Sequence, residues 1–209
     1  MPGMRVTALP GLEPSQVSSV ERIYLEAFPA GERMPFEEIV RDVNEGVRIA
    51  YVALDEGIAL GFASAYVLRS VQTFYLEYLA IDERYRGGGF GGELWYHIRT
   101  DAQRHRGVTA IVLEVEDPDE PDIDPRTTVA RRRRICFYEN RGARRLPTTD
   151  FRVPLLQGDG EKPMLLMWAP AARPDPPTGD DLTDLVRALY EEGYDLPPDH
   201  PLVIAASGK

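Results

Sequence analysis

The sequence has little of the side-chain chemistry on which disulfides and metal sites depend. Its 209 residues include a single cysteine, Cys136, and three histidines. One cysteine cannot form an intrachain disulfide and cannot supply a thiolate-rich metal site. The histidines, His97, His105 and His200, are scattered and follow no metal-ligand spacing. We therefore expect no bound metal.

Long apolar runs are also missing. Nowhere do about 18 apolar residues follow one another, which is the length that a membrane-spanning helix needs. The first ten residues lack a basic segment followed by an apolar one. We expect a cytoplasmic protein with no membrane partner.

Positive charge is in short supply. The chain has 24 Lys and Arg against 34 Asp and Glu, for a formal net charge of -10, which disfavours binding to the phosphates of nucleic acids. The run Arg131 to Arg134 is the exception. It follows the acidic stretch from Glu116 to Asp124, and we expect these opposite charges to balance each other. No nucleic-acid partner is expected.

Composition and length indicate one full domain with an appendage. Hydrophobic residues make up 43% of the chain and charged residues 28%, which is typical of a globular protein. At this length two complete domains are not expected. We place a domain over residues 1–170, and a proline-rich linker with a C-terminal helix over 171–209.

The C-terminal helix is predicted to be amphipathic. Its apolar stripe consists of Leu182, Leu185, Val186 and Leu189. Leaving that stripe in water would cost about 1.5 to 3 kcal/mol per side chain, so we expect it to dock on another apolar surface. A second subunit is the favoured surface, which predicts a homodimer. Docking on the helix's own domain is the alternative.

Three β-rich runs with short connections predict a sheet that begins as an antiparallel meander. Before the meander we expect a short strand over 4–9, a helix from an N-cap at Ser15 to about Phe28, and a second helix that starts at Pro35 and is closed by Gly46. The meander strands are expected at 47–54, 58–69 and 72–81.

The chain then changes to a βαβ unit. Phe90, Leu94, Ile98 and Ala102 recur at helical spacing, and a strand over 109–116 must pair in parallel across that helix. A helix over 129–140 and strands at 143–153 and 163–169 follow. The predicted fold class is α/β (α+β), with a mixed central sheet, helices on both faces and a helical C-terminal extension.

A glycine-rich loop separates the third meander strand from the helix of the βαβ unit. Backbone N–H groups and the helix dipole make such a junction an anion site, and glycines let a phosphate come close. A dinucleotide site is one interpretation, because Gly87, Gly89 and Gly92 satisfy G-x-G-x-x-G and Glu114 lies about 20 residues further on. The five residues from Asp82 to Arg86 before the first glycine count against it.

The segment from Tyr75 to Gly91 resembles motif A of the GNAT superfamily of N-acetyltransferases. The signature of that motif is Q/R-x-x-G-x-G/A shortly after a strand, and Arg86, Gly89 and Gly91 occupy its fixed positions. Further along the chain, 112–115 resembles the next family strand, and 137–142 resembles the end of the family's L-Y-x-x-x-G-F helix.

The resemblance covers roughly residues 4–169 and has departures. Arg131 stands where the family often has Asn, and Ala143 where Phe is usual. The acidic insert over 117–128 is longer than is typical of the family.

The resemblance implies acetyl-CoA as the cofactor. The residues implied to bind it are Leu79, Ala80, Ile81, Arg86, Gly87, Gly88, Gly89, Phe90, Gly91 and Gly92, with Arg131 as a further candidate in place of Asn. The backbone N–H of Leu79 would polarise the thioester carbonyl. The loop that carries Glu32 and Arg33 borders the acceptor site in relatives, so these two are acceptor-binding candidates.

Acyl transfer to an amine requires a base. An amine with a pKa near 10 must lose a proton before it attacks, and a carboxylate can take that proton. Glu114 and Glu77 are the candidates, because each lies in a predicted internal strand, where a carboxylate is costly without a partner or a function. The alternatives are that Glu114 lies at an exposed strand end with Glu116, and that Glu77 pairs with an arginine such as Arg69.

The leaving thiolate requires a proton. The resemblance assigns Tyr138 as the donor, whereas the residues alone would make it a core aromatic. A covalent route through Cys136 would need a cationic or histidine neighbour. The nearest histidine, His105, is far away in sequence, so we expect Cys136 to be a buried helix residue.

These features predict an N-acetyltransferase that transfers an acyl group directly from acetyl-CoA to a primary amine. An acidic site would favour a cationic acceptor, either a small molecule or a peptide. The alternative is a catalytically inactive acyl-CoA-binding regulatory or interaction module, which would need no base.

Overall fold

The structure, a computed structural model, describes residues 3–157 and 160–206. Two compact units divide the chain. Within the described residues, the first unit comprises 3–66, 76–104 and 156–157, and the second comprises 67–75, 105–155 and 160–206. The strands β3 and β4 run from one unit into the other, so each unit is described by itself below.

The first unit is built on the predicted meander. Its strands β1 (Arg5–Ala8), β2 (Ile49–Asp55), β3 (Ile58–Leu68) and β4 (Thr73–Ile81) are neighbours in that order. The β1–β2 and β2–β3 pairs are antiparallel. Glu56 and Gly57 join β2 to β3 with φ of 46° and 84°, as a two-residue hairpin turn with positive φ at both central residues requires. The predicted meander is confirmed.

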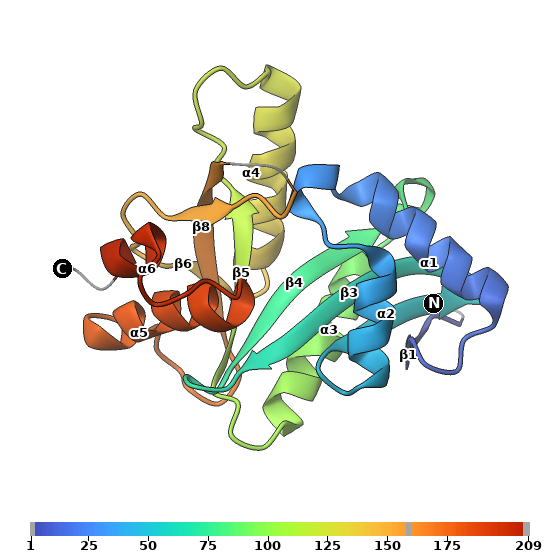
Figure 1. Cartoon of the computed structure of the whole chain (residues 1–209). Helices are drawn as coiled ribbons and strands as arrows, with labels where there is room; N and C mark the ends of the chain where they lie inside the picture. Colours follow the sequence, from blue (N-terminus) through green and yellow to red (C-terminus); the bar gives the residue numbers. More distant parts are fainter. Residues whose placement is uncertain (1–2, 158–159, 207–209) are drawn as a thin grey trace. The chain divides into compact units, whose positions relative to one another are not determined.

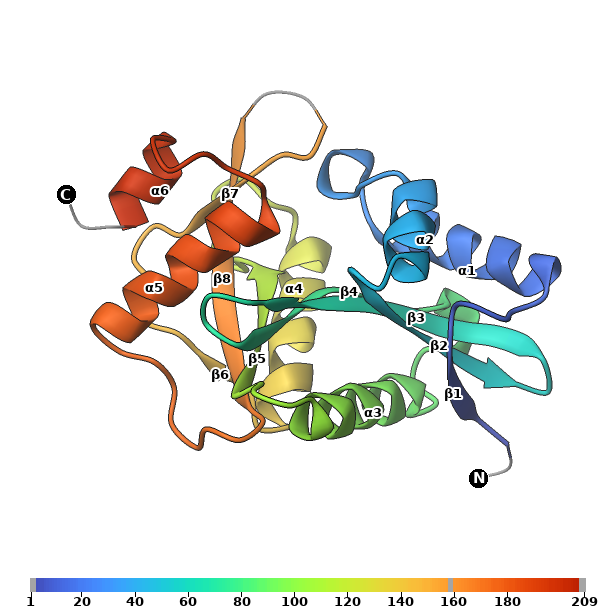
Figure 2. The ribbon, with the colours of Figure 1, turned by 60° about the horizontal axis from the view of Figure 1, so that its bottom comes forward.

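Helices cover both faces of this part of the sheet. Figures 1 and 2 show α1 (Pro14–Ala27) and α2 (Phe36–Asn44) on one face and α3 (Phe90–Arg104) on the other. On the first face the ring of Tyr24 lies 6.0 Å from that of Phe62 and 5.0 Å from that of Tyr78. On the second face Leu94, Trp95, Ile98 and Ala102 of α3 are buried. The buried side chains of the helices on both faces therefore complete the core of this unit.

The starts of the first two helices differ from the prediction by a residue or two. The N-cap of α1 is Glu13, whose backbone N–H donates to the Gln16 side chain at 3.0 Å. Pro14 then occupies the first helical position, which suits a residue without an N–H. The predicted N-cap at Ser15 is wrong for this reason. Pro35 is the N-cap of α2, so the prediction that it is the first helical residue is also wrong.

The second unit is built on β5 (Ala110–Glu116) and β8 (Glu161–Pro170), which pair antiparallel. The short strands β6 (Arg144–Arg145) and β7 (Arg152–Pro154) both pair with β8. A single strand was expected over 143–153, and that expectation is wrong. Pro147 between them has no N–H for a ladder, and Asp150 takes a left-handed φ of 49°.

The βαβ unit is confirmed. β4 and β5 are neighbours in the strand order and are joined through α3, the kind of crossover that a parallel pair needs. The fold is thus a mixed α/β sheet, with a meander followed by a parallel pair and with helices at its C-terminal end.

Helix α4 (Pro125–Glu139) begins four residues before the predicted start at Val129. The Asp124 side chain accepts hydrogen bonds from the N–H groups of Arg126 at 2.8 Å and Thr127 at 3.1 Å, and Pro125 takes the first position. This is an N-cap followed by an N1 proline. Within the second unit, Figure 2 shows α4 and α5 (Asp180–Ala188) on opposite sides of β5 and β8.

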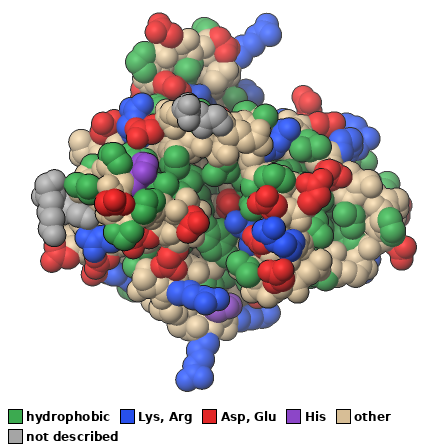
Figure 3. Space-filling view, in the orientation of Figure 1, with side chains coloured by type: hydrophobic (Ala, Val, Ile, Leu, Met, Phe, Trp, Pro, Cys, Tyr) green, Lys and Arg blue, Asp and Glu red, His purple; other side chains and the backbone are tan. Residues whose placement is uncertain are grey.

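The insert and the arginine run neutralise each other. Arg131 is 8% exposed, donates to the carbonyl of Asp117 at 2.7 Å and pairs with Glu120 at 2.5 Å. Arg132 pairs with Asp119 at 2.9 Å, and Arg134 pairs with Glu116. Figure 3 shows acidic and basic side chains side by side over this region, at the top of the view. The predicted charge balance is confirmed for Arg131, Arg132 and Arg134.

The C-terminal residues continue the second unit. Helix α5 leads into a π-helical turn, Leu189–Gly193, and a further helix that was not predicted, α6 (Pro201–Ala206). Leu185, Val186 and Leu189 are buried and Leu182 is half-buried. The apolar stripe is therefore covered within one chain. The expectation that a second subunit covers the stripe is wrong. The homodimer remains a prediction, but the apolar stripe no longer supports it.

Candidate active site

The glycine loop opens α3 in the first unit. The first helical hydrogen bonds run to the carbonyl of Gly89, from the N–H groups of Gly92 at 2.9 Å and Glu93 at 3.2 Å. The N–H groups of Phe90 and Gly91 precede these bonds and carry the positive end of the helix dipole. Gly89 has a left-handed φ of 87°, which an L-residue adopts only with strain. The loop is exposed and suited to an anion.

Gly87 and Gly88 shape the same loop in different ways. Gly87 also has a left-handed φ, of 85°, and a Cβ added there or at Gly89 would meet no atom within 4 Å. A Cβ at Gly88 would lie 2.7 Å from the ring of Phe90. Gly88 therefore gives room to a side chain of the helix, whereas the space beside Gly87 and Gly89 is open to a ligand.

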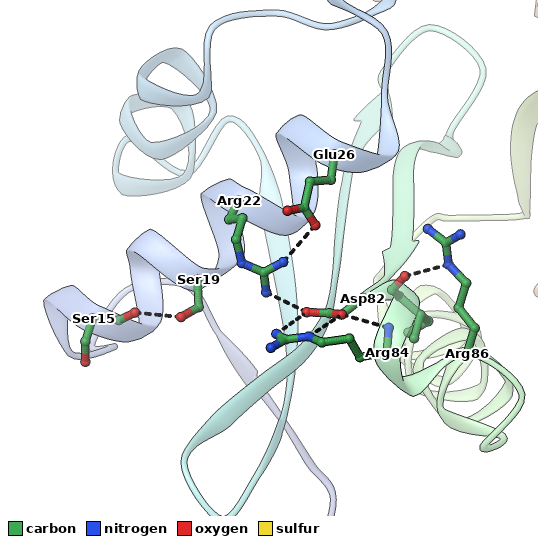
Figure 4. Close-up of polar contacts among 8 residues, drawn as sticks. Ser15, Ser19, Arg22, Glu26, Asp82, Arg84 and Arg86 are labelled. Atoms are coloured by element: carbon green, nitrogen blue, oxygen red, sulfur yellow. Dashed lines mark hydrogen bonds and ion pairs between the residues drawn. The ribbon is translucent and has the colours of Figure 1, made fainter.

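A buried carboxylate anchors the segment between β4 and the loop. Asp82 pairs with Arg84 at 2.6 Å and with Arg22 of α1 at 2.5 Å, and it accepts the N–H of Arg84 at 3.0 Å. Figure 4 shows the two guanidinium groups on either side of this carboxylate. The hydrogen bonds from Arg84 and Arg22 hold the pKa of Asp82 well below its usual range. The Nε of Arg86 donates to the carbonyl of Ile81 at 3.0 Å, which places Arg86 beside the end of β4.

The last residues of β4 lead directly to this anchor. Leu79 and Ile81 are half-buried and Ala80 is buried. Gly61 of β3 lies opposite them, where a Cβ would sit 2.8 Å from the carbonyl oxygen of Ala80. The first unit therefore holds the whole predicted cofactor set except Arg131.

Glu77 is held by an arginine. It pairs with Arg48, which also pairs with Asp42 at 2.9 Å and lies over the ring of Tyr66 at 4.7 Å. The side chains of Glu77 and Arg48 are 10% and 11% exposed. The alternative of an ion pair is confirmed, with Arg48 in place of Arg69. A carboxylate neutralised in this way is a weaker candidate for a base.

Glu114 has a different environment in the second unit. Its Oε2 accepts hydrogen bonds from the hydroxyl of Tyr75 at 3.0 Å and from that of Tyr194 at 2.5 Å. Its Oε1 is buried and accepts no hydrogen bond from the described residues. Burial raises the pKa of Glu114 to about 7, although the two tyrosine hydrogen bonds act to lower it. The alternative of an exposed strand end is wrong, and that carboxyl can gain or lose a proton near neutral pH.

Tyr138 lies on α4 in the same unit as Glu114. It is 6% exposed, and its ring centroid is 5.0 Å from that of Phe137. Burial raises the pKa of Tyr138 to about 12. The phenol therefore keeps its proton throughout the neutral range, as a proton donor must.

The three remaining candidates for ligand binding are Arg131, Arg33 and Glu32. Arg131 donates a hydrogen bond to the carbonyl of Asp117 and pairs with Glu120, as described above. The Nη1 of Arg33 donates to the carbonyls of Leu25 at 2.7 Å and Phe28 at 2.5 Å, which satisfies the C-terminal end of α1. Glu32 ends the 3₁₀ turn Ala30–Glu32. Their roles toward ligands remain predictions.

Cys136 is exposed on α4, so the expectation of a buried cysteine is wrong. His97 is exposed on α3. Among the described residues, no group of three or more His, Cys, Asp or Glu side chains could hold a metal ion. In the same part of the chain, no helix has the length and apolar character to cross a bilayer.

Sequence reasoning missed Arg48 and Tyr194 as partners of the two candidate bases. Arg48 precedes Glu77 by 29 residues, and Tyr194 follows Glu114 by 80. No periodicity or motif links residues so far apart. The one sequence signal was a buried carboxylate in each strand, which demands a partner without identifying it.

Residues 17–124 match the sequence model of the acetyltransferase (GNAT) family. No curated protein sequence matches the chain.

Several solved structures share the fold. A GNAT-family protein from Bacteroides thetaiotaomicron is 24% identical with a TM-score of 0.70, and the alignment covers 92% of this chain and 99% of that one. The ribosomal-protein-S18-alanine N-acetyltransferase from Escherichia coli is 19% identical with a TM-score of 0.54, over 86% and 98%. An aminoglycoside 6'-N-acetyltransferase complexed with coenzyme A is 20% identical with a TM-score of 0.56, over 84% and 99%.

Proposed function

Because the chain belongs to the acetyltransferase (GNAT) family, with acetyl-CoA as its cofactor, we propose that it transfers the acetyl group directly to a primary amine, with Glu114 as the general base. The observation that carries this proposal is the environment of the Glu114 carboxyl. Its Oε1 is buried, its Oε2 accepts hydrogen bonds from two tyrosine hydroxyls, and burial raises its pKa to about 7. A base is most effective when its pKa is near the working pH.

The glycine loop fits the pyrophosphate of acetyl-CoA. Open space lies beside Gly87 and Gly89, and the N–H groups of Phe90 and Gly91 precede the helical hydrogen bonds. We assign the cofactor to these residues together with Leu79, Ala80, Ile81, Arg86, Gly88 and Gly92. When bound, the cofactor supplies an activated acetyl thioester.

The residues of the chain then have separate tasks. Glu114 takes a proton from the amine, which has a pKa near 10 and arrives protonated. Tyr138 gives a proton to the leaving sulfur. The backbone N–H of Leu79 donates to the carbonyl oxygen that gains charge during attack. Glu77 is the weaker candidate for the base, because Arg48 already neutralises it.

We propose a cationic amine as the acceptor. The chain carries a net charge of -10, and opposite charges steer encounter. Glu32 and Arg33 are the proposed acceptor-side residues. The solved relatives point to two amine classes, since one is a ribosomal-protein-S18-alanine N-acetyltransferase and another an aminoglycoside 6'-N-acetyltransferase.

An acceptor screen tests this function. The full chain is incubated with acetyl-CoA and, in turn, spermidine, an aminoglycoside, a lysine-containing peptide and a peptide with N-terminal alanine. Release of free thiol is followed, and Glu114→Gln serves as the control. We expect release above the amine-free rate with at least one of the four. If acetyl-CoA binds but no amine raises the rate, the inactive acyl-CoA-binding module is the better reading.

Gly89→Ala is expected to weaken acetyl-CoA binding about tenfold. An L-residue with the positive φ of Gly89 costs about 1 to 2 kcal/mol. Relief of that strain rotates the peptide group between residues 89 and 90, and with it the N–H of Phe90. Gly46→Ala is the matched control, because Gly46 follows α2 with a φ of 73° and has no atom within 4 Å of an added Cβ. Calorimetry with acetyl-CoA measures both. Equal affinity in the two variants would rule out the loop as the pyrophosphate site.

A further inference from the structure

Tyr194 connects the C-terminal segment to the proposed base. It lies well beyond residues 17–124, which carry the family match. Its hydroxyl donates to the Oε2 of Glu114 at 2.5 Å, across 80 residues of sequence.

The turn that carries Tyr194 is held at several points. The Glu192 carboxylate accepts hydrogen bonds from the N–H groups of Arg69 at 2.6 Å and Ser70 at 3.0 Å, and from the Ser70 hydroxyl. The Tyr190 hydroxyl donates to the carbonyl of Arg152 at 2.7 Å. The N–H of Tyr194 itself donates to the carbonyl of Leu189 at 3.2 Å, which closes the π-helical turn. The contacts of Glu192 and the closure of the turn fix where the hydroxyl of Tyr194 can reach. Tyr190 is also held by its ring, which stacks on that of Phe151 at 5.7 Å, so the turn does not depend on its hydroxyl.

A π-helical turn has a geometric effect on this residue. It adds a residue to one turn of helix and is frequent at functional sites. Here it follows α5 directly and ends at Gly193, one residue before Tyr194. Asp195 follows with a left-handed φ of 52°. The chain therefore leaves the helix at a defined point, with the tyrosine at its exit.

Few groups face the Glu114 carboxyl. Tyr75 approaches from β4, and Tyr194 from the C-terminal turn, with Tyr190 on the same turn. The nearest charges on β5 belong to Glu116, which pairs with Arg134 and lies 3.8 Å from Lys162. No described Lys or Arg pairs with Glu114. Two neutral hydroxyls therefore set its hydrogen bonding, both on the same oxygen.

We propose that Tyr194 is a positioning residue for acetyl transfer, contributed by the C-terminal segment, which holds Oε2 of Glu114 so that Oε1 is left to take the proton of the amine. The inference rests on the proposed function. In the step, the N–H bond of the acceptor breaks, its electron pair stays on nitrogen, and an O–H bond forms at Oε1. Tyr194 keeps its own proton and gives Glu114 a fixed orientation.

The hydrogen bond also has a predictable effect on ionisation. A donor to a carboxylate favours the charged form, and its removal raises the pKa of the carboxyl. Tyr194→Phe should therefore move the titration of Glu114 upward by about one pH unit. A residue that only filled space would leave that titration where it is.

Three full-length variants test the proposal: Tyr194→Phe, Glu192→Ala and Tyr190→Phe. The titration of Glu114 is followed by the carbon-13 shift of its carboxyl, without any substrate. We expect Tyr194→Phe to raise the midpoint by about one unit, and Glu192→Ala to raise it in the same direction. Tyr190→Phe loses a hydroxyl from the same turn but no bond to Glu114, so its midpoint should stay within about 0.2 units of the native value. An unshifted midpoint in Tyr194→Phe would overturn the proposal.

Kinetics separates this inference from the proposed function. With an amine found in the screen, Tyr194→Phe should lower kcat/KM about tenfold at pH 6, below the native pKa, and little at pH 9. If the midpoint moves and the pH profile does not, Tyr194 positions a carboxyl that is not the base, and the positioning role in catalysis fails. If Glu114→Gln alone is fully active, the proposed base fails, whatever Tyr194 does to the titration.

Discussion

Glu114→Gln is expected to lower kcat for acetyl transfer about 100- to 1,000-fold, the share that a positioned general base usually contributes. Glutamine keeps the shape of the side chain and offers an amide oxygen to Tyr75 and Tyr194, but it cannot take a proton. The change therefore removes the base and leaves the packing. Initial rates at saturating acetyl-CoA and acceptor measure it.

The pH profile gives the same test without a mutation. With a pKa of about 7, raised by burial, Glu114 is protonated below that pH and cannot act as a base. kcat/KM of the native chain should therefore rise with pH through about 7. That rise should be missing from the residual activity of Glu114→Gln.

The stability of Glu114→Gln shows whether its loss of activity comes from the missing base or from a disturbed fold. When a carboxyl has a higher pKa in the folded than in the unfolded state, its contribution to stability depends on pH. The contribution is fully present below the pKa of the unfolded state, and it is lost as the pH rises through the pKa of the folded state. For Glu114 the window runs from about 4.5 to about 7. Ionised Glu114 thus costs the native chain about 3 kcal/mol above pH 7. Glu114→Gln should melt no lower than the native chain at pH 8.

Glu77→Gln is the matched comparison for the other candidate base. It should lower stability, because it removes one of the two carboxylates that neutralise the half-buried Arg48. It should keep the rise of kcat/KM through pH 7. A loss of that rise in Glu77→Gln, with an active Glu114→Gln, would move the base to Glu77.

Tyr138→Phe is expected to lower turnover about 10- to 1,000-fold with little change in acetyl-CoA affinity. A thiolate that leaves without a proton is a poorer leaving group, whereas the phenol hydroxyl adds little to the binding of the ground state. Because burial raises the pKa of Tyr138 to about 12, the defect should be constant from pH 6 to 9. Turnover and a calorimetric Kd, measured on the same variant, separate the two effects.

Tyr190→Phe is the control for this substitution. Tyr190 is also a buried tyrosine of the second unit, with its pKa likewise raised by burial to about 12, and it has no proposed role in proton transfer. Its turnover should stay close to native. Full activity of both Tyr138→Phe and Glu114→Gln across pH 6 to 9 would place the chemistry on other residues and favour the binding module.

The sequence by itself determined the features that depend on neighbouring residues. The meander could be predicted because its strands are β-rich and its connections are short, which favours the pairing of each strand with the next. The glycine loop could be predicted because positive φ at Gly87 and Gly89 is a local steric demand that glycine meets. The start of α4 was also encoded locally, in Asp124 and Pro125, but the prediction passed over that N-cap.

Only the tertiary structure decided which surfaces and partners meet. The apolar stripe of α5 required a cover, but its spacing says nothing of which surface provides one, and the structure buries it within its own chain. Helical position likewise left Cys136 free to be core or surface, and it is exposed. Glu114 required a partner, and Tyr194 reaches it across 80 residues. A buried polar group requires a hydrogen bond, whereas the packing of distant segments decides which residue forms it.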